Sequence, residues 1–84
     1  MRQDGEYLKY PVTIKKKVWA KASAISGHPH DIWRRDKHGN PIHWQEYGNE
    51  NSRYGWKILN IHPDNNAPAD INYLHPVHHT VTNI

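Results

Sequence analysis

The chain has 84 residues, a formal net charge of +3, a pI near 9.3 and no cysteine, and 36% of its residues are hydrophobic. This length allows a single small domain, and the lack of cysteine excludes disulfides and thiolate zinc sites, which stabilise many domains of this size. Because no apolar run reaches the roughly 18 residues of a membrane span and residues 1–10 lack the apolar core of a signal peptide, we expect a cytoplasmic protein without membrane contact.

The first predicted element is a helix over residues 13–26, which follows an N-terminal arm over residues 1–11 and opens a single domain over residues 12–84. Thr13 is a suitable N-cap, and Gly27 is a suitable terminator. The apolar residues of this segment recur at helical spacing, so we expect one stripe of them to face the core. The stripe consists of Ile14, Val18, Ala22 and Ile25.

Two short strands are predicted next, over residues 32–36 and 41–44, with a turn over residues 37–40 in which Gly39 is free to take a positive φ. A polar loop separates them from a strand over residues 56–61. Alternation along that strand places Trp56, Ile58 and Asn60 on one face and Lys57, Leu59 and Ile61 on the other.

The last third of the chain is predicted as an Asn/Pro-rich loop over residues 63–70, an extended segment over residues 71–77 and a short C-terminal helix over residues 78–83. Pro76 has no amide proton, so it excludes a central sheet position for the extended segment.

Basic side chains concentrate on the predicted helix and around the predicted hairpin. They are Lys15, Lys16, Lys17, Lys21, Arg34, Arg35, Lys37 and Arg53. A solvated helix face and a strand edge protected by charge are the simpler interpretation. The alternative is a surface that contacts phosphates or a partner. The mild basic charge permits contact with nucleic acid or with an acidic protein face.

Several short segments, in order and at matching spacings over residues 12–80, resemble a subgroup of HNH endonucleases. That family shows a Trp-x-x-Asp strand, a Gly-Asn turn, a Tyr-Gly-Trp-Glu-Ile-Asp-His-Ile core, a Pro loop and an Asn-Leu-Gln-Pro-Leu-His segment that opens a helix. The corresponding segments here are Val18-Trp19, Trp33-Arg34-Arg35-Asp36, Gly39-Asn40, Tyr54-Gly55-Trp56, Ile61-His62-Pro63 and Leu74-His75-Pro76-Val77-His78.

The resemblance implies an α+β fold, a small HNH-like domain of the ββα-metal type with an N-terminal helix, short β-hairpins and a short C-terminal helix. In the family, a carboxylate and a helix histidine hold one divalent metal, and an adjacent histidine is the general base. Residues at four of the family's functional positions are replaced here. The replacements are Leu59 for the metal-binding Asp, Asn60 for the base, Tyr73 for the Asn before Leu-Gln-Pro and Thr82 for the last helix ligand.

Only His78 remains of that set, so the resemblance predicts a retained scaffold with no catalytic residues and no metal or other cofactor. A rebuilt metal site is an alternative that uses His62, His75, His78 and His79. Pro76 disfavours a helix that would place His75 and His79 on one face. We therefore favour histidines that are not ligands.

The sequence predicts a catalytically inactive HNH-like domain that acts as a binding or inhibitory protein with a protein partner. A phage or mobile-element protein of the anti-CRISPR type, which blocks a host nuclease complex, is the favoured setting. The alternatives are a non-cleaving nucleic-acid-binding protein, an HNH endonuclease with an atypical histidine site and a structural subunit of a larger assembly.

Overall fold

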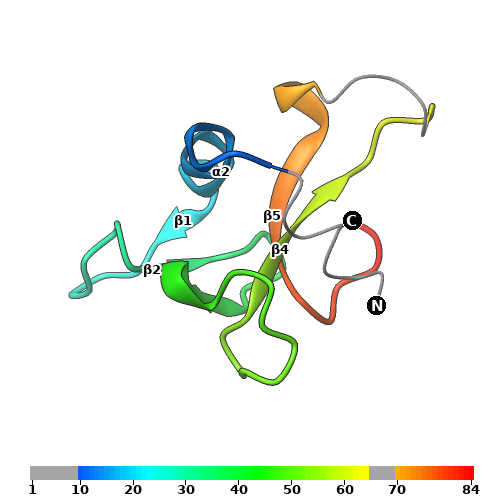
Figure 1. Ribbon diagram of the computed structural model, residues 1–84. Helices are drawn as coiled ribbons and strands as arrows, with labels where there is room; N and C mark the ends of the chain where they lie inside the picture. The colour runs from blue at the N-terminus through cyan, green and yellow to red at the C-terminus, as the bar shows by residue number, and fades with distance from the viewer. Residues whose placement is uncertain (1–9, 65–69) are drawn as a thin grey trace.

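The computed structural model describes residues 10–64 and 70–84, which form a small α+β domain with one helix and two antiparallel sheets (Figure 1). In chain order the elements are the helix α2 (Val12–Trp19), the strands β1 (Ser23–Ala24), β2 (Trp33–Arg35) and β3 (Pro41–His43), the 3-10 turn η1 (Trp44–Glu46), the strand β4 (Trp56–Asn60), the 3-10 turn η2 (Ile71–Tyr73) and the strand β5 (Leu74–His78). Strands β1, β2 and β3 form one sheet, and β4 and β5 form the other. An α+β class with an N-terminal helix and short hairpins is therefore confirmed.

Helix α2 is shorter than predicted, and its N-cap is Pro11 rather than Thr13. The chain leaves the helix through a turn in which the amide of Lys21 donates to Val18 O at 2.9 Å, and it then enters β1. The guanidinium of Arg34 donates to the carbonyl oxygens of Ala20 at 3.3 Å and Ala22 at 2.8 Å. In a longer helix, those carbonyls would accept from backbone amides of the next turn. The long-range contact with Arg34 takes the place of these bonds, and the predicted last two turns do not form.

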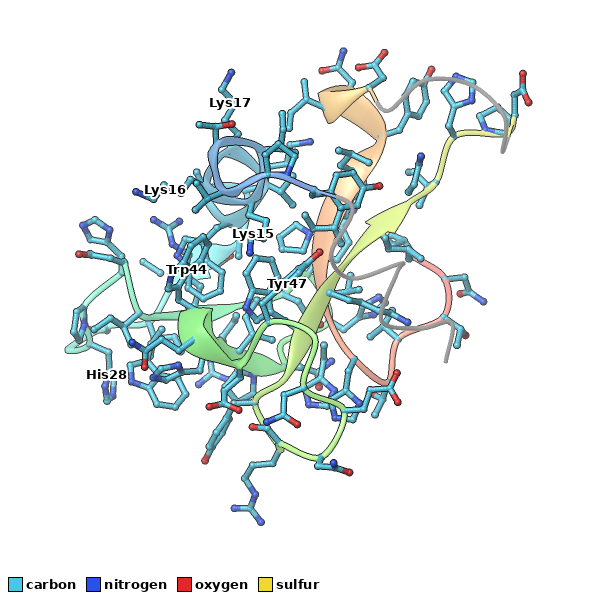
Figure 2. All side chains as sticks on the ribbon, in the orientation of Figure 1. Lys15, Lys16, Lys17, His28, Trp44 and Tyr47 are labelled. Atoms are coloured by element: carbon cyan, nitrogen blue, oxygen red, sulfur yellow. The ribbon has the colours of Figure 1, made fainter. Side chains whose placement is uncertain are left out.

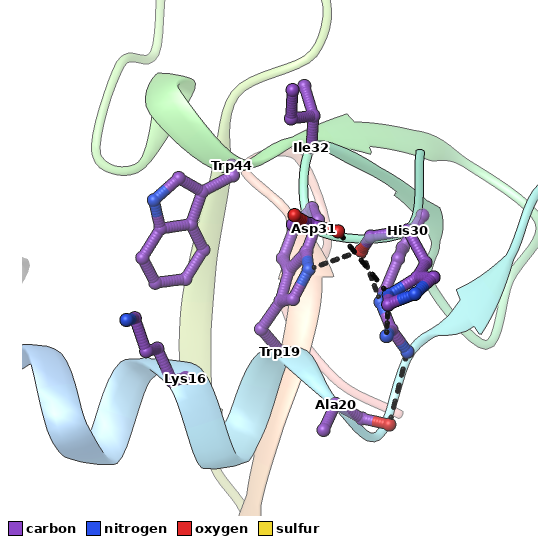
Figure 3. Close-up of a pocket in the computed structure, with 8 residues that line it drawn as sticks. Lys16, Trp19, Ala20, His30, Asp31, Ile32 and Trp44 are labelled. Carbon is purple, nitrogen blue, oxygen red and sulfur yellow. Dashed lines mark hydrogen bonds and ion pairs between the residues drawn. The ribbon is translucent and has the colours of Figure 1, made fainter. Parts of the chain in front are cut away.

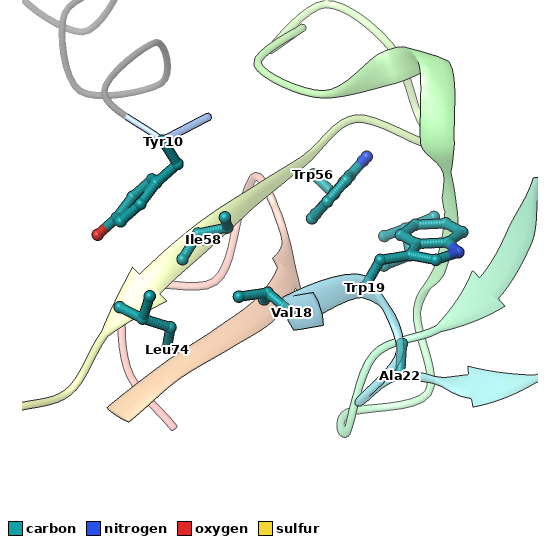
Figure 4. Packing of buried hydrophobic residues seen from close by; sticks show 8 residues of the cluster. Tyr10, Val18, Trp19, Ala22, Trp56, Ile58 and Leu74 are labelled. Atoms are coloured by element: carbon teal, nitrogen blue, oxygen red, sulfur yellow. The ribbon is translucent and has the colours of Figure 1, made fainter. Parts of the chain in front are cut away.

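Buried residues of α2 and the β4–β5 hairpin share one core, with Val18 and Trp56 fully buried (Figure 4). Trp56 and Ile58 face this core, as the alternation predicted. The ring centroid of Trp19 lies 5.0 Å from that of Trp56 and 5.6 Å from that of Trp44. The tryptophan rings thus supply much of the apolar volume of the core in a chain that has no phenylalanine.

The predicted hairpin of β2 and β3 is present, and Gly39 takes φ +88° in its turn. Asp36, only 3% exposed, fixes this turn. Its Oδ1 accepts from the amides of His38 at 3.0 Å and Asn40 at 2.8 Å, and its Oδ2 accepts from Asn40 Nδ2 at 3.1 Å and the His78 amide at 2.9 Å. Burial alone would raise the pKa of the Asp36 carboxyl, but these hydrogen bonds outweigh it and hold that pKa below its usual value.

The predicted C-terminal helix is wrong, because His78 ends β5 and residues 79–84 contain no helix. The amide of His78 donates to Asp36, and the amide of His79 donates to Gly55 O at 3.0 Å. These long-range bonds keep the backbone extended where a helix would begin. Of the arm predicted over residues 1–11, residues 1–9 lie outside the described part, and Tyr10 is buried in the core.

Candidate functional site

Three of the four positions at which the resemblance places catalysis lie together beside β4. They line a groove of about 440 Å³, which we call the hairpin groove. Its lining residues are Leu59, Asn60, Ile61, Thr82, Asn83 and Ile84. The fourth position, Tyr73, does not line it, and its ring packs against the imidazole of His62 at a centroid distance of 4.4 Å.

The side chains that line the hairpin groove carry alkyl, hydroxyl and carboxamide groups, with no carboxylate or imidazole side chain among them. The side-chain oxygen of Asn60 accepts from the amide of His62 at 2.9 Å, so this carboxamide supports the local turn. Carboxamide oxygens can contribute to a site for a hard divalent cation, but the carboxylates that supply the negative charge of such a site are missing from these side chains. A proton acceptor near neutral pH is normally an imidazole or a carboxylate. In the part of the chain that the structure describes, no group of three or more His, Asp or Glu side chains is placed to hold a metal.

The retained His78 uses both ring nitrogens within the fold. Its Nε2 lies 2.8 Å from the carbonyl oxygen of Arg53, and its Nδ1 lies 2.8 Å from Thr80 Oγ1 and 3.3 Å from the Thr80 amide. A carbonyl only accepts, so Nε2 carries a proton and Nδ1 accepts from Thr80. His78 therefore joins the end of β5 to the loop before β4.

The other three histidines of the alternative metal site have separate surroundings. His62 Nδ1 accepts from the Asp64 amide at 2.9 Å, and the ring of His79 packs against His78 at 4.4 Å. His75 lies near Lys21 and Lys37, and burial together with these two ammonium groups holds the pKa of His75 below its usual value. The structure does not bring the four imidazoles together as one ligand set.

The predicted basic residues divide into two groups. Four of them make contacts that hold the fold: Lys15 lies over the Tyr47 ring at 4.5 Å, Lys21 donates to the Ile71 and Leu74 carbonyls, Arg34 donates to the His30 and Ala22 carbonyls, and Arg35 donates to Gly39 O. The other four are exposed and make no side-chain hydrogen bond or ion pair with residues 10–64 and 70–84. They are Lys16, Lys17, Lys37 and Arg53.

Two exposed lysines project from α2, and one of them, Lys16, lies beside an aromatic surface. Figure 2 shows Lys16 and Lys17 pointing away from the helix, with Trp44 and Tyr47 below it. Lys16 and Trp19 are three positions apart and lie on neighbouring parts of the helix surface. Nothing in the sequence links Trp44 to the lysines of α2, and only the fold places its ring beside the helix.

Trp19 and Trp44 form the aromatic part of a pocket of about 490 Å³, which we call the indole pocket (Figure 3). Its lining residues are Lys16, Trp19, Ala20, His30, Asp31, Ile32, Arg34 and Trp44. Trp19 Nε1 and Arg34 Nε both donate to the His30 carbonyl, at 2.9 and 2.8 Å, and fix the wall opposite Trp44. Asp31 lies 3.5 Å from the His30 ring, whereas Lys16 makes no such bond among the described residues.

The chain matches no family model, no curated protein and no solved structure. Among the described residues, no helix has the length and apolar character that spanning a membrane requires. The HNH resemblance therefore stays a prediction, and the hairpin groove and the indole pocket are the two features from which a function can be inferred.

Proposed function

We propose that the protein is a binding protein without nuclease chemistry, and that it docks onto an acidic protein surface through the indole pocket and the lysines of α2. The observation that carries this proposal is the position of Lys16, a cation that makes no bond to residues 10–64 and 70–84, beside the indole of Trp44. Tryptophan and charged side chains around a desolvated pocket dominate the energy of many protein interfaces.

The pocket's chemistry defines the contact expected from the partner. The rings of Trp19 and Trp44 suit an aliphatic or aromatic side chain, and the ammonium group of Lys16 suits a carboxylate next to it. The exposed side chain of Ile32, 39% exposed, extends the apolar surface on the pocket's side. The proposed partner surface is an apolar side chain flanked by acidic residues.

The hairpin groove supports a role without phosphodiester cleavage. Leu59 cannot bind a metal, Asn60 cannot take a proton from water at neutral pH, and the bonds of His78 lie within the fold. A small protein that keeps a nuclease-like arrangement but docks onto another protein is suited to inhibition. We extend the proposal to a phage or mobile-element protein that blocks a host nuclease complex, which is the setting that the sequence favours.

Nucleic-acid binding is the second candidate, and the partly exposed indole of Trp44 next to Lys16 favours it. Bases stack on exposed indoles, and lysines neutralise phosphates along a single strand. Binding of this kind weakens steeply with salt. Anisotropy of a labelled single-stranded oligonucleotide at two salt concentrations measures it directly.

A paired capture experiment tests the proposal. The wild-type protein, Lys16→Glu and Arg53→Glu are immobilised and exposed to nuclease-treated bacterial lysate. Lys16 and Arg53 are both exposed cations, so the two variants change the charge equally, but only Lys16 lines the pocket. We expect a stoichiometric acidic partner that the wild type and Arg53→Glu retain and that Lys16→Glu loses.

Two results would contradict the proposal. One is the absence of a stoichiometric protein partner, and the other is a partner that Lys16→Glu retains in full. Nicking of plasmid DNA with Mg²⁺, Mn²⁺, Ni²⁺ or Zn²⁺ that disappears in His78→Ala would replace it with the atypical nuclease.

A further inference from the structure

Three basic side chains from separate segments meet at a small cavity of about 30 Å³. Lys21 follows α2, Lys37 lies in the β2–β3 turn and His75 lies on β5, and we call them the basic cluster. Ala22 and Pro76 complete the lining. We propose that the basic cluster binds a tetrahedral oxyanion, such as a phosphate group, in this cavity.

The hydrogen-bonding capacity of Lys21 supports this site. Its ammonium has three N–H donors, and two of them go to the carbonyl oxygens of Ile71 and Leu74, the latter at 2.9 Å. These bonds fix the position of the ammonium at the cavity and leave one donor for a ligand. Lys37 is exposed and makes no side-chain bond within the described residues, so its ammonium is available to the same ligand.

The charge around His75 is positive on the elements that pack against β5. Lys57 lies on the same face of the β4–β5 hairpin, where the strand register pairs it with Val77. Asp36 is committed to amides of its own turn and of β5, and Asp70 accepts from the amide of Asn72. Neither carboxylate is bonded to a member of the basic cluster.

The same field separates an anion from a metal ion as the ligand. Lys21 and Lys37 both line the cavity, so an added positive charge would meet two ammonium groups there, and after burial these same groups lower the pKa of His75. A divalent cation would meet the same repulsion, whereas an oxyanion would be attracted. This reassigns His75 from the alternative metal site to an anion site.

Anion binding and the protonation of His75 are coupled. A protonated imidazole donates from both nitrogens and a neutral one from a single nitrogen, so an anion raises the pKa of His75 toward or above its usual value. Reciprocally, the site binds the anion more tightly as pH falls through the titration of His75.

A histidine titration by NMR, on the isolated protein with sodium sulfate as the probe, tests this. Sulfate keeps its charge over the titration range, and sodium chloride at equal ionic strength controls for screening. We expect sulfate to raise the pKa of His75 by about one unit relative to chloride. Lys37→Ala should remove most of this shift. Lys17→Ala is the control, because it also removes one positive charge but at α2, outside the basic cluster, and it should preserve the shift.

The proposal is overturned if chloride and sulfate act equally on His75, or if Lys37→Ala responds to sulfate as the wild type does. If sulfate does act on His75, a comparison of the affinities of inorganic phosphate and phosphoserine at pH 7.5 distinguishes a free anion from a phosphate carried on a partner. No protein partner takes part, so the result is independent of the docking at the indole pocket.

Discussion

The β4–β5 hairpin and the indole pocket use polar groups in opposite ways. In the hairpin, the ring of His78 and the carboxamide of Asn60 are bonded to the chain itself. At the pocket, Lys16 is exposed and makes no bond to the described residues. The hairpin thus uses these polar groups within the fold, whereas the pocket leaves Lys16 without a bond to the described residues.

This contrast separates two kinds of substitution. Changes in the hairpin and in the residues that hold it act mainly on the free energy of unfolding. Changes at the exposed side of the pocket act mainly on affinity for a partner. Substitutions in each region can test whether effects on stability and effects on affinity separate in this way.

Gly55→Ala should destabilise the fold most, by more than about 3 kcal/mol. A Cβ at this position would lie 1.9 Å from the carbonyl oxygen of Asn49 and 3.1 Å from the His79 ring, so backbone must move. Urea unfolding measures the loss. Gly39→Ala is the matched control, since only its φ of +88° opposes a side chain and nothing lies within 4 Å; a cost of about 1 kcal/mol is expected there. Equal losses in the two variants would contradict the role of close packing at Gly55.

Asp36→Ala should lower the free energy of unfolding by about 2–4 kcal/mol at pH 7, because it leaves the partly buried amides of His38, Asn40 and His78 without their acceptor. Since the folded pKa of Asp36 is lowered, its stabilisation is fully present above the unfolded value of 3.8 and is lost as pH falls through the folded value. Unfolding curves from pH 6 to pH 2 measure this for both proteins. The gap between them should narrow at low pH, and a gap that stays constant would contradict the assignment.

Trp44→Ala should weaken partner binding by about 2 kcal/mol, or roughly 30-fold, and should lower stability less than Asp36→Ala does. The Trp44 ring is only partly buried, and its backbone carbonyl, which accepts from Trp56 Nε1 at 3.2 Å, remains in the variant. Calorimetric titration with the captured partner measures the affinity. Unchanged affinity would place the interface elsewhere on the protein.

The double variant Leu59→Asp with Asn60→His should produce no nuclease activity. It restores the two side chains that the resemblance assigns to metal binding and proton transfer, but the nitrogens of His78 stay bonded to Arg53 and Thr80. In addition, residues 79–84 contain no helix to supply a further ligand. Plasmid nicking with Mg²⁺ or Mn²⁺ measures this. Cleavage that His78→Ala abolishes would show that the scaffold still supports the chemistry.

Local patterns predicted the elements that depend on neighbouring residues. The turn at Gly39 and the buried face of Trp56 and Ile58 follow from a positive φ and from strand alternation, and both are present. The ends of helices depended on partners far along the chain. Arg34 donates to a carbonyl just beyond α2, and Asp36 accepts from the His78 amide, where a C-terminal helix was predicted to begin.

The candidate site was less accessible to sequence reasoning than the fold. Leu59, Asn60 and Thr82 do line one groove, but the HNH resemblance that singled them out stays a prediction. The indole pocket depends on Trp19 and Trp44, 25 positions apart, and no local periodicity links them. The same holds for Lys21 and His75, which only the packing of α2 against β5 brings to one cavity.

The outward edge of β5 bears on whether the protein aggregates. Pairing with β4 leaves the amides of residues 74, 76 and 78 pointing away from the hairpin. The Leu74 amide donates to Ile71 O, the His78 amide donates to Asp36, and Pro76 has no amide proton. A strand from another molecule would find no available amide donor at these three positions, so this edge of β5 is protected against intermolecular β-addition.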